Sequence, residues 1–448
     1  MTEARALERS SGPPAGLERG RHRRSKGVAA GTGWGPPDLL ALVVLAALAV
    51  ALFSPAWSEP SRALVGVPAD NVLTAWCLGW VAHALAGGHS LLYSHAVGAP
   101  QGVNLLSSTP VVLAGLFLSP VTLLAGPVVA YDVAATGAVA LSAWCAYLCL
   151  RRYAPGRLGP LLGGLVYGFS PVMLAQSYGH LQVTAAFTPP LLVILIDEAL
   201  ARRRRPAALL GAGAGLLLSA QLLLSSEVLA TEVLMAAVLL VVLAVLHPRS
   251  VPSCLPRAAV AAAAAGLVFV VLAGWPLYME LAGPGHTLAG TIRGHDSYVN
   301  DLANLVAPTA VQALGPAPVA AHFRAGLVES DGYLGIPLLA VVLFGLWRFR
   351  RNPAVPAAGL VGLVAVAFSL GPHLQIGGRV TAIPLPWLGL DHLPVLRDVL
   401  PSRMAAYADL AAGLILAVTV GEAGALGARR RAPAGRLRPG RSGVAGAG

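Results

Sequence analysis

The sequence predicts an all-α protein, a polytopic transmembrane helix bundle of about ten spans with juxtamembrane helices on its outer face. Only 11% of the 448 residues are charged and 56% are hydrophobic, whereas an average soluble domain is roughly 25% charged. Several apolar stretches of about 17–24 residues are long enough to cross a hydrocarbon core of roughly 30 Å. One topology also places 25 of the 31 Lys and Arg residues on one side and nine of the 11 His residues on the other. Because loops rich in Lys and Arg stay in the cytoplasm, the histidine-rich side is the outer side.

The basic charge balance does not indicate nucleic acid binding. The net charge is +11, but the basic residues are spread over short loops and two tails, as is typical of charges that set membrane topology. The four cysteines show no metal-ligand spacing, and Cys145 and Cys149 lie one helical turn apart in an apolar stretch. We therefore expect small packing residues and no disulfide framework.

The topology divides the chain into a basic N-terminal tail (residues 1–37), a transmembrane domain (38–421) and a basic C-terminal tail (422–448). The tails combine Arg with Gly, Pro and Ser and lack apolar periodicity, so we expect them to be disordered. Both termini are predicted to be cytoplasmic, in a multi-pass protein of the plasma membrane. The predicted outer loops are residues 58–127, 276–332 and 372–402.

We place the spans near residues 38–57, 128–150, 159–176, 183–200, 206–225, 228–246, 257–275, 333–347, 354–371 and 403–420. One assignment stays open at residues 109–125, an apolar stretch that Pro110 and Pro120 interrupt. If Arg151 is cytoplasmic, only one crossing fits between the first span and Arg151, and residues 109–125 then lie in or dip into the outer leaflet. In the other interpretation these residues cross the membrane and Arg151 lies outside.

The first outer loop contains a predicted amphipathic helix that begins at Asp70 and Asn71. Leu73, Trp76, Trp80 and Ala84 recur at three- and four-residue spacing, which predicts an aromatic face resting on the membrane. Asp70 has two interpretations that do not exclude each other. It caps the helix through its side-chain acceptor, or it is a catalytic carboxylate that the helix start holds rigidly.

Histidines also cluster in this loop, at positions 83, 89 and 95. Their spacing is neither the i, i+4 pair of a helical metal site nor a finger pattern, so we predict no metal site there.

The outer loop 276–332, which we call the third outer loop because a short outer turn precedes it, contains Asp296 and Asp301. These two offer paired carboxylates for Mg²⁺ or Mn²⁺, although solvated loop acids are the commoner case. The sequence therefore identifies no cofactor and leaves a divalent cation, Mg²⁺ or Mn²⁺, open.

The second outer segment is a short turn with polar residues close to two spans. Gln176, Tyr178, His180 and Gln182 surround Gly179. Polar groups so near a span are costly unless they face a cavity or water. His180 therefore either contacts a substrate or is an interfacial histidine, and the sequence leaves both interpretations open.

Arginines are rare on the predicted outer side. Arg293 accompanies Asp296 in the third outer loop, and Arg397 and Arg403 lie close together before the last span. Arg403 has three interpretations: snorkelling to the interface, a salt bridge to Asp398 or Asp409, or bidentate binding of a phosphate. The proximity of the last two arginines favours phosphate.

The chain resembles the GT-C superfamily of integral-membrane glycosyltransferases, especially actinobacterial members without a large C-terminal domain. An acidic residue, Asp70, follows the first span in a long outer loop. The segment RRYAPGR (151–157) is followed by LLGGLVYGFSPVMLAQSYGHLQ (161–182), similar to the second and third spans of that superfamily. HLPVLRDVLPSRM (392–404) is similar to its last outer loop. The resemblance covers most of residues 38–420.

The resemblance implies that Asp70 orients or deprotonates the acceptor hydroxyl. Family members often carry a second acid in the next short outer loop, where this chain has His180 and no acid. His180 then either replaces that acid or donates to the donor phosphate, and Arg397 or Arg403 stabilises the leaving phosphate. The implied donor is a polyprenyl-phosphate-linked sugar, hexosyl or pentosyl, whose lipid tail lies in the bilayer. The implied acceptor is a cell-envelope glycan, lipid or protein.

Further candidates for the outer-face site are Asn71, Gln182, Arg293 and Asp296. Two other functions stay open: a transporter or flippase of a lipid-linked saccharide, and a non-catalytic membrane assembly protein. Neither a Gly-x-Ser-x-Gly elbow nor a phosphate-cradling Gly-Lys-Ser/Thr loop occurs in the sequence. Serine hydrolase and nucleotide hydrolase functions are therefore not expected.

Overall fold

The computed structural model describes residues 35–66, 70–107, 111–286, 296–393 and 395–431, and helices dominate these residues. The α-helices are α1 (Pro36–Leu52), α2 (Ser54–Ser58), α3 (Asp70–Gly87), α4 (Val112–Ala125), α5 (Pro127–Leu150), α6 (Leu158–Gly168), α7 (Pro171–Gln176), α8 (Leu181–Thr184), α9 (Thr188–Asp197), α10 (Ala207–Leu222), α11 (Ser226–Leu246), α12 (Val251–Ala282), α13 (Gly326–Glu329), α14 (Ile336–Arg348), α15 (Ala354–Ser369), α16 (Trp387–Leu390) and α17 (Ala405–Arg431). The strands form two antiparallel hairpins, β1 (Tyr93–Ser94) with β2 (Val103–Asn104) and β3 (His373–Ile376) with β4 (Arg379–Pro384). The predicted all-α class is confirmed.

Among the described residues, five helical segments are long and apolar enough to cross a membrane. They are Pro127–Leu150, Leu181–Arg202, Ser226–Leu246, Pro248–Ala282 and Pro401–Ala428. The other predicted spans coincide with shorter apolar helices, namely α1, α6, α10, α14 and α15. The structure therefore supports a membrane protein with at least five helices of spanning length and composition.

Two helices are longer than the sequence predicts. Helix α12 continues to Ala282, so the start of the predicted outer loop 276–332 is helical. Helix α17 continues to Arg431, which makes the first ten residues of the predicted disordered tail helical. The reason lies in composition, because Ala, Leu, Glu and Arg favour helix and the next proline is Pro433.

Helix α4 bears on the open question of residues 109–125. It has 14 residues, one more than α14, so its length does not separate a juxtamembrane element from a crossing. It packs against α3, a helix of the first outer loop, and Gly126 at φ +91° turns the chain before α5 begins at Pro127. The contact with α3 favours a juxtamembrane element. Residues 109 and 110 lie outside the described residues.

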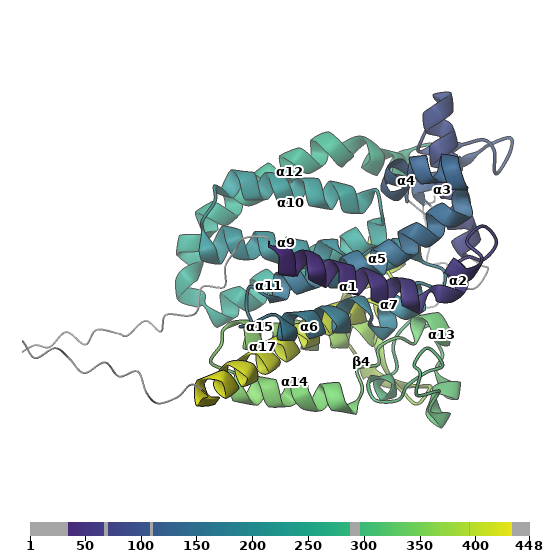
Figure 1. The fold of residues 1–448 in the computed structure, drawn as a ribbon. Coiled ribbons are helices and arrows are strands. Elements are labelled where there is room, and N and C mark those ends of the chain that lie inside the picture. The colour runs from purple at the N-terminus through teal and green to yellow at the C-terminus, as the bar shows by residue number, and fades with distance from the viewer. Residues whose placement is uncertain (1–34, 67–69, 108–110, 287–295, 394, 432–448) are drawn as a thin grey trace, which may run out of the picture.

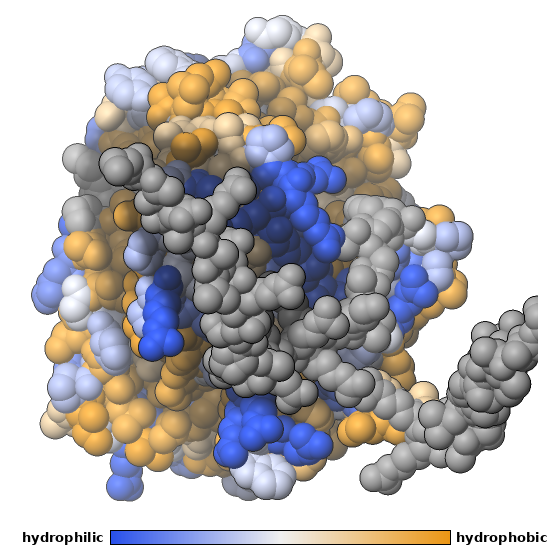
Figure 2. All heavy atoms as spheres, turned by 90° about the vertical axis from the view of Figure 1, so that its left-hand side faces the viewer, coloured by the Kyte–Doolittle hydropathy of each residue, from blue (hydrophilic) through white to orange (hydrophobic). Residues whose placement is uncertain are grey.

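The long helices lie side by side, and the loop elements gather at one end of the bundle (Figure 1). We call the end that carries α2, α3, α4 and α13 the outer end, after its predicted side, and the opposite end the arginine end. Figure 2 faces the arginine end and shows hydrophilic side chains gathered within a hydrophobic surround. Arg203, Arg204 and Arg205, between α9 and α10, are exposed.

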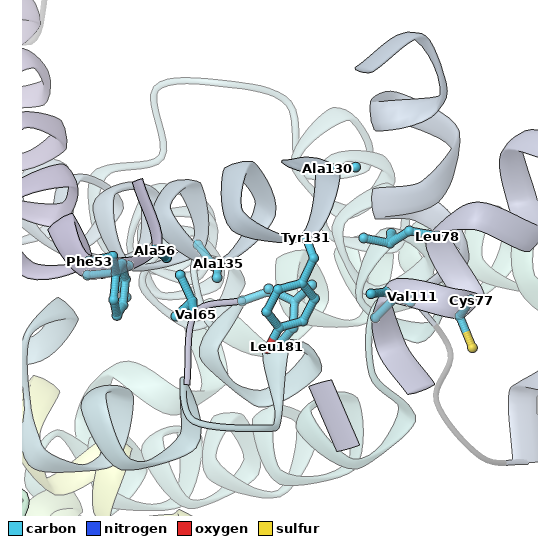
Figure 3. Packing of buried hydrophobic residues seen from close by; sticks show 14 of the residues in the cluster. Phe53, Ala56, Val65, Cys77, Leu78, Val111, Ala130, Tyr131, Ala135 and Leu181 are labelled. Carbon is cyan, nitrogen blue, oxygen red and sulfur yellow. The ribbon is translucent and has the colours of Figure 1, made fainter. Parts of the chain in front are cut away.

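A buried cluster near the outer end joins α1, α5 and the first outer loop (Figure 3). Phe53, Val65, Tyr131 and Leu181 are each at most 8% exposed. Val65 precedes α3 in the chain and is buried in the same cluster as Tyr131 of α5. Hydrophobic burial thus positions the helix on which Asp70 lies.

Small residues bring pairs of helices into close contact. A Cβ atom added at Gly163 of α6 would collide with the carbonyl of Gly413 of α17, and the reverse collision also holds. Gly211 and Gly215 of α10 approach the backbone of α12 in the same way. Small residues at such contacts are typical of helix packing in membranes, where van der Waals contact replaces the hydrophobic effect.

The predicted helix of the first outer loop is confirmed from Asp70 to Gly87. Leu73 is 40% exposed, and Trp76 and Trp80 are partly exposed, as expected for a face that meets the membrane. Ala84, which we placed on the same face, is buried. The ring centroids of Trp76 and Trp80 are 6.0 Å apart and the rings are stacked.

Candidate functional site

Asp70 is the first residue of α3, and its side chain is 67% exposed. The start of α3 is held by two buried hydrogen bonds. The Asn71 side chain donates to the carbonyl of Val65 at 3.1 Å, and the amide of Val65 donates to Asp132 of α5 at 2.8 Å. Asn71, which we proposed as a site residue, therefore anchors the neighbouring carboxylate.

The carboxylate of Asp70 meets His180, as its Oδ2 lies 3.2 Å from Nε2 of the ring. His180 lies in the turn between α7 and α8. Its amide donates to the carbonyl of Gln176 at 2.7 Å, and its own carbonyl accepts from the amide of Val183 at 2.9 Å. The turn therefore fixes the imidazole, and two candidates that are 110 positions apart in sequence are in contact.

His180 is largely buried, and its side chain is 20% exposed. Burial and the positive charge of Arg403 lower the pKa of His180 below its ordinary value, despite the opposing charges of Glu329 and Asp70. A neutral imidazole carries one N–H donor and one acceptor. The Asp70 contact requires the hydrogen on Nε2, which leaves Nδ1 as a buried acceptor that has no partner among the described residues.

Arg403 is not a free phosphate ligand. One terminal nitrogen donates to Glu329 Oε1 at 2.9 Å, and the other forms a short ion pair with Glu227. The side chain is 9% exposed. Both ordinary explanations that we considered, snorkelling and pairing with Asp398 or Asp409, are therefore wrong. The partners, Glu227 of α11 and Glu329 of α13, are far from Arg403 in the sequence, so sequence analysis did not identify them.

This cluster connects three parts of the chain. Glu329 Oε2 accepts from the hydroxyl of Ser402 at 2.6 Å, and Glu227 Oε1 accepts from the amide of Leu400 at 3.0 Å. Burial opposes the charged form of Glu329, but the charge and hydrogen bond of Arg403 outweigh it and place the pKa of Glu329 below its ordinary value. The cluster therefore holds one positive and two negative charges.

A second buried acid lies beside Glu329. The side-chain amide of Gln176 donates to Glu329 Oε2 at 3.1 Å and contacts Asp331 Oδ2 at 3.3 Å. Burial, reinforced by the charge of Glu329, raises the pKa of Asp331 to about 8. Asp331 is therefore mainly protonated at neutral pH, and its Oδ1 has no hydrogen-bond partner among the described residues.

Sequence reasoning did not select Glu227, Glu329 or Asp331 as site residues. They lie in predicted outer segments of the chain, but the sequence carries no signal that brings them together. Polar groups near a span are costly, and this signal had selected Gln176, whose side chain contacts Glu329 and Asp331. Perturbed carboxyl pairs of this kind cluster at functional sites, although ion-pair networks with a structural role perturb pKa values too.

The remaining candidates are dispersed. Arg397 is exposed, with its Nε 3.6 Å from Asp398. Gln182 lies in α8, and its Oε1 is buried and lacks a partner among the described residues. Asp296 pairs with His373 of β3 at 3.1 Å. Arg293 lies outside the described residues.

The paired carboxylates that we considered for Mg²⁺ or Mn²⁺ have separate partners. Asp301 accepts three backbone N–H bonds, from Ala303 at 2.8 Å, Gly377 at 2.9 Å and Gly378 at 2.7 Å. In the part of the chain that the structure describes, no group of three or more His, Cys, Asp or Glu side chains is arranged to hold a metal ion. Asp301 thus ties β3 and β4 to the preceding loop.

A family model described as "Domain of unknown function (DUF6311)" matches residues 40–399. The match covers most of the chain, including Asp70, His180 and the acids of the third outer loop, and ends before Arg403. No curated protein and no solved structure matches the chain.

Proposed function

We propose that this chain, which belongs to the DUF6311 family, is a membrane glycosyltransferase. It moves a hexosyl or pentosyl group from a polyprenyl-phosphate-linked donor to an acceptor on the extracytoplasmic face. The acceptor is a glycan, lipid or protein of the cell envelope. The proposed topology has ten crossings in the plasma membrane, with both termini cytoplasmic and the outer end outside.

The observation that most supports this proposal is the contact between Asp70 and His180. Asp70 is exposed and His180 is largely buried, so the pair lies at the boundary between solvent and the charged cluster around Arg403. A general base must be within hydrogen-bond reach of the proton it removes. The exposed carboxylate has that access, and the fixed imidazole orients it.

In the proposed reaction, the Asp70 carboxylate takes the proton of the acceptor hydroxyl. The hydroxyl oxygen forms a bond to the anomeric carbon of the donor, and the bond from that carbon to the phosphate oxygen breaks. Polyprenyl phosphate leaves with the electron pair.

Arg403 and Arg397 have different roles in this proposal. Arg403 already pairs with two carboxylates, so it holds α11, α13 and the loop before α17 together and polarises His180. Arg397 is exposed at the outer end and is our candidate for the leaving phosphate, because a guanidinium matches phosphate bidentately. We include no metal ion in the mechanism.

The test is transfer of radiolabelled sugar from polyprenyl-phosphate donors to a cell-envelope extract by the purified full-length protein. Asp70→Asn keeps the size of the side chain and removes the base. We expect a loss of at least 100-fold, typical for a general base. Glu59→Gln, at an exposed acid of the same outer loop, is the matched control and retains full activity. Equal transfer by wild type and Asp70→Asn would refute the role of Asp70.

A transporter or flippase of a lipid-linked saccharide is the second candidate. The cavity between the helices has mainly apolar walls, which suit a lipid chain better than a saccharide, so it provides no path for the sugar. A non-catalytic assembly protein is the remaining alternative, and it predicts that Asp70→Asn and His180→Gln both complement a deletion strain fully.

A further inference from the structure

A cavity of about 510 Å³ lies among α5, α9, α11, α15 and α17. It follows one face of α11, where Met235, Leu239 and Leu243 recur at helical spacing. Glu232 lines one end and His247 the other. From Glu232 to His247 the chain advances 15 residues, or about 22 Å at 1.5 Å per residue, which is the length of lining that this segment contributes.

The end near the outer side is closed by hydrogen bonds between helices. The hydroxyls of Thr231 (α11) and Tyr407 (α17) are 2.9 Å apart. Thr188 of α9 lies 2.6 Å from Gln221 Oε1 and 2.9 Å from Glu232 Oε2. A long chain therefore cannot pass from the cavity to the Arg403 cluster without breaking these contacts.

The other end of the cavity reaches the surface at the arginine end. Ala201 and His247 line it and are exposed, and Asn352 lines it as well. Each of these positions has arginines within one to four residues along the chain. They are Arg202, Arg203, Arg204, Arg205, Arg249, Arg348, Arg350 and Arg351.

Acidic groups at this mouth are already neutralised. Asp197 accepts from Arg152 at 3.0 Å and from Arg202 at 2.6 Å, and Glu198 accepts from Arg152 at 2.7 Å. The mouth therefore keeps an excess of positive charge. Figure 2 shows hydrophilic side chains gathered in the middle of this face, inside a hydrophobic surround.

We infer that this cavity binds one acyl chain of an anionic glycerophospholipid, whose phosphate head group lies among the arginines at the mouth. Basic pockets between helices on the cytoplasmic side are suited to anionic head groups. The lining from Glu232 to His247 extends about 22 Å, more than the roughly 15 Å of one leaflet, which is long enough to accommodate one acyl chain. A polyprenyl chain is too long for a cavity with a closed end, which separates this site from the donor site of the proposed function.

Native mass spectrometry of the purified full-length protein tests the site with added phosphatidylglycerol. Leu239→Trp fills the cavity and lowers phosphatidylglycerol binding at least tenfold. Leu240→Trp is the matched control on the same helix, because Leu240 is 42% exposed on the outer surface of the bundle, and it leaves binding unchanged. Ala357→Leu fills the cavity from α15 and has the same effect as Leu239→Trp, which guards against a folding defect in either variant.

The head group is tested separately. Phosphatidylcholine with the same chains binds more weakly, and Arg204→Gln lowers phosphatidylglycerol binding about fivefold, the equivalent of one surface charge. Binding that is equal in wild type, Leu239→Trp and Ala357→Leu would overturn the inference. Tighter binding of polyprenyl phosphate than of phosphatidylglycerol, with sensitivity to Leu239→Trp, would overturn it as well. These readouts require no glycosyl transfer, so they stand apart from the proposed function.

Discussion

Replacing Arg403 by methionine tests the energetic role of the buried ion cluster. Methionine keeps most of the apolar stem of arginine but removes the charge that Glu329 and Glu227 share. Removing one partner of a buried pair leaves an uncompensated charge and costs about 3–5 kcal/mol. Arg403 is 9% and Glu329 6% exposed, so solvent compensates little at this pair.

The assay is unfolding of the purified protein in mixed micelles, monitored by circular dichroism. Arg403→Met alone is expected to lose about 3–5 kcal/mol. Adding Glu329→Gln removes the orphaned charge and recovers about 1–3 kcal/mol, the usual coupling energy of neighbours in a network. Arg397→Met is the control, since an exposed ion pair is worth at most about 1 kcal/mol.

A loss below about 1 kcal/mol for Arg403→Met would refute this reasoning, because it would mean that Glu329 is not buried with a full charge. Strict additivity of the two substitutions would refute the contact between Arg403 and Glu329 itself.

The remaining predictions concern proton binding, packing and topology. The pKa of Asp331 is raised to about 8 in the folded state from an ordinary value of 3.8, so the folded state holds the extra proton and unfolding free energy falls as pH rises between these values; thermal unfolding from pH 5 to 9 should show a shallower decline for Asp331→Asn. Gly163→Ala forces a Cβ against the carbonyl of Gly413 and should destabilise by about 1–3 kcal/mol, whereas Gly137→Ala, with no atom within 4 Å of its added Cβ, should stabilise by about 0.5–1 kcal/mol; the opposite order in unfolding assays would contradict the packing. Arg204→Cys should react with an impermeant maleimide only after cells are opened, and reaction in intact cells would place the arginine end outside.

The helices were predictable because their signal is local. Long apolar runs and the alternation of arginines located each of the five helical segments of spanning length among the described residues. Helix ends were less predictable. The segment 159–176 divides into α6 and α7 because Ser170 caps α7 through the amide of Met173 and Pro171 follows it, and we had treated this segment as one span.

The site was predictable only in part. Asp70 and His180 were selected for their residue type and predicted side, and the fold brings them into contact. The partners of Arg403 were not predictable, because Glu227 and Glu329 lie 176 and 74 positions away. Any acid near an outer helix end was an equal candidate, and only the packing of α11 and α13 against the last loop selects these two.

The measurement that tests the central claim most directly is sugar transfer from a polyprenyl-phosphate donor by wild type, Asp70→Asn and Glu59→Gln, prepared side by side. The account predicts labelled envelope product with wild type and Glu59→Gln and at least 100-fold less with Asp70→Asn. Product formed equally by all three would contradict it, because the exposed carboxylate beside His180 would then take no part in the reaction.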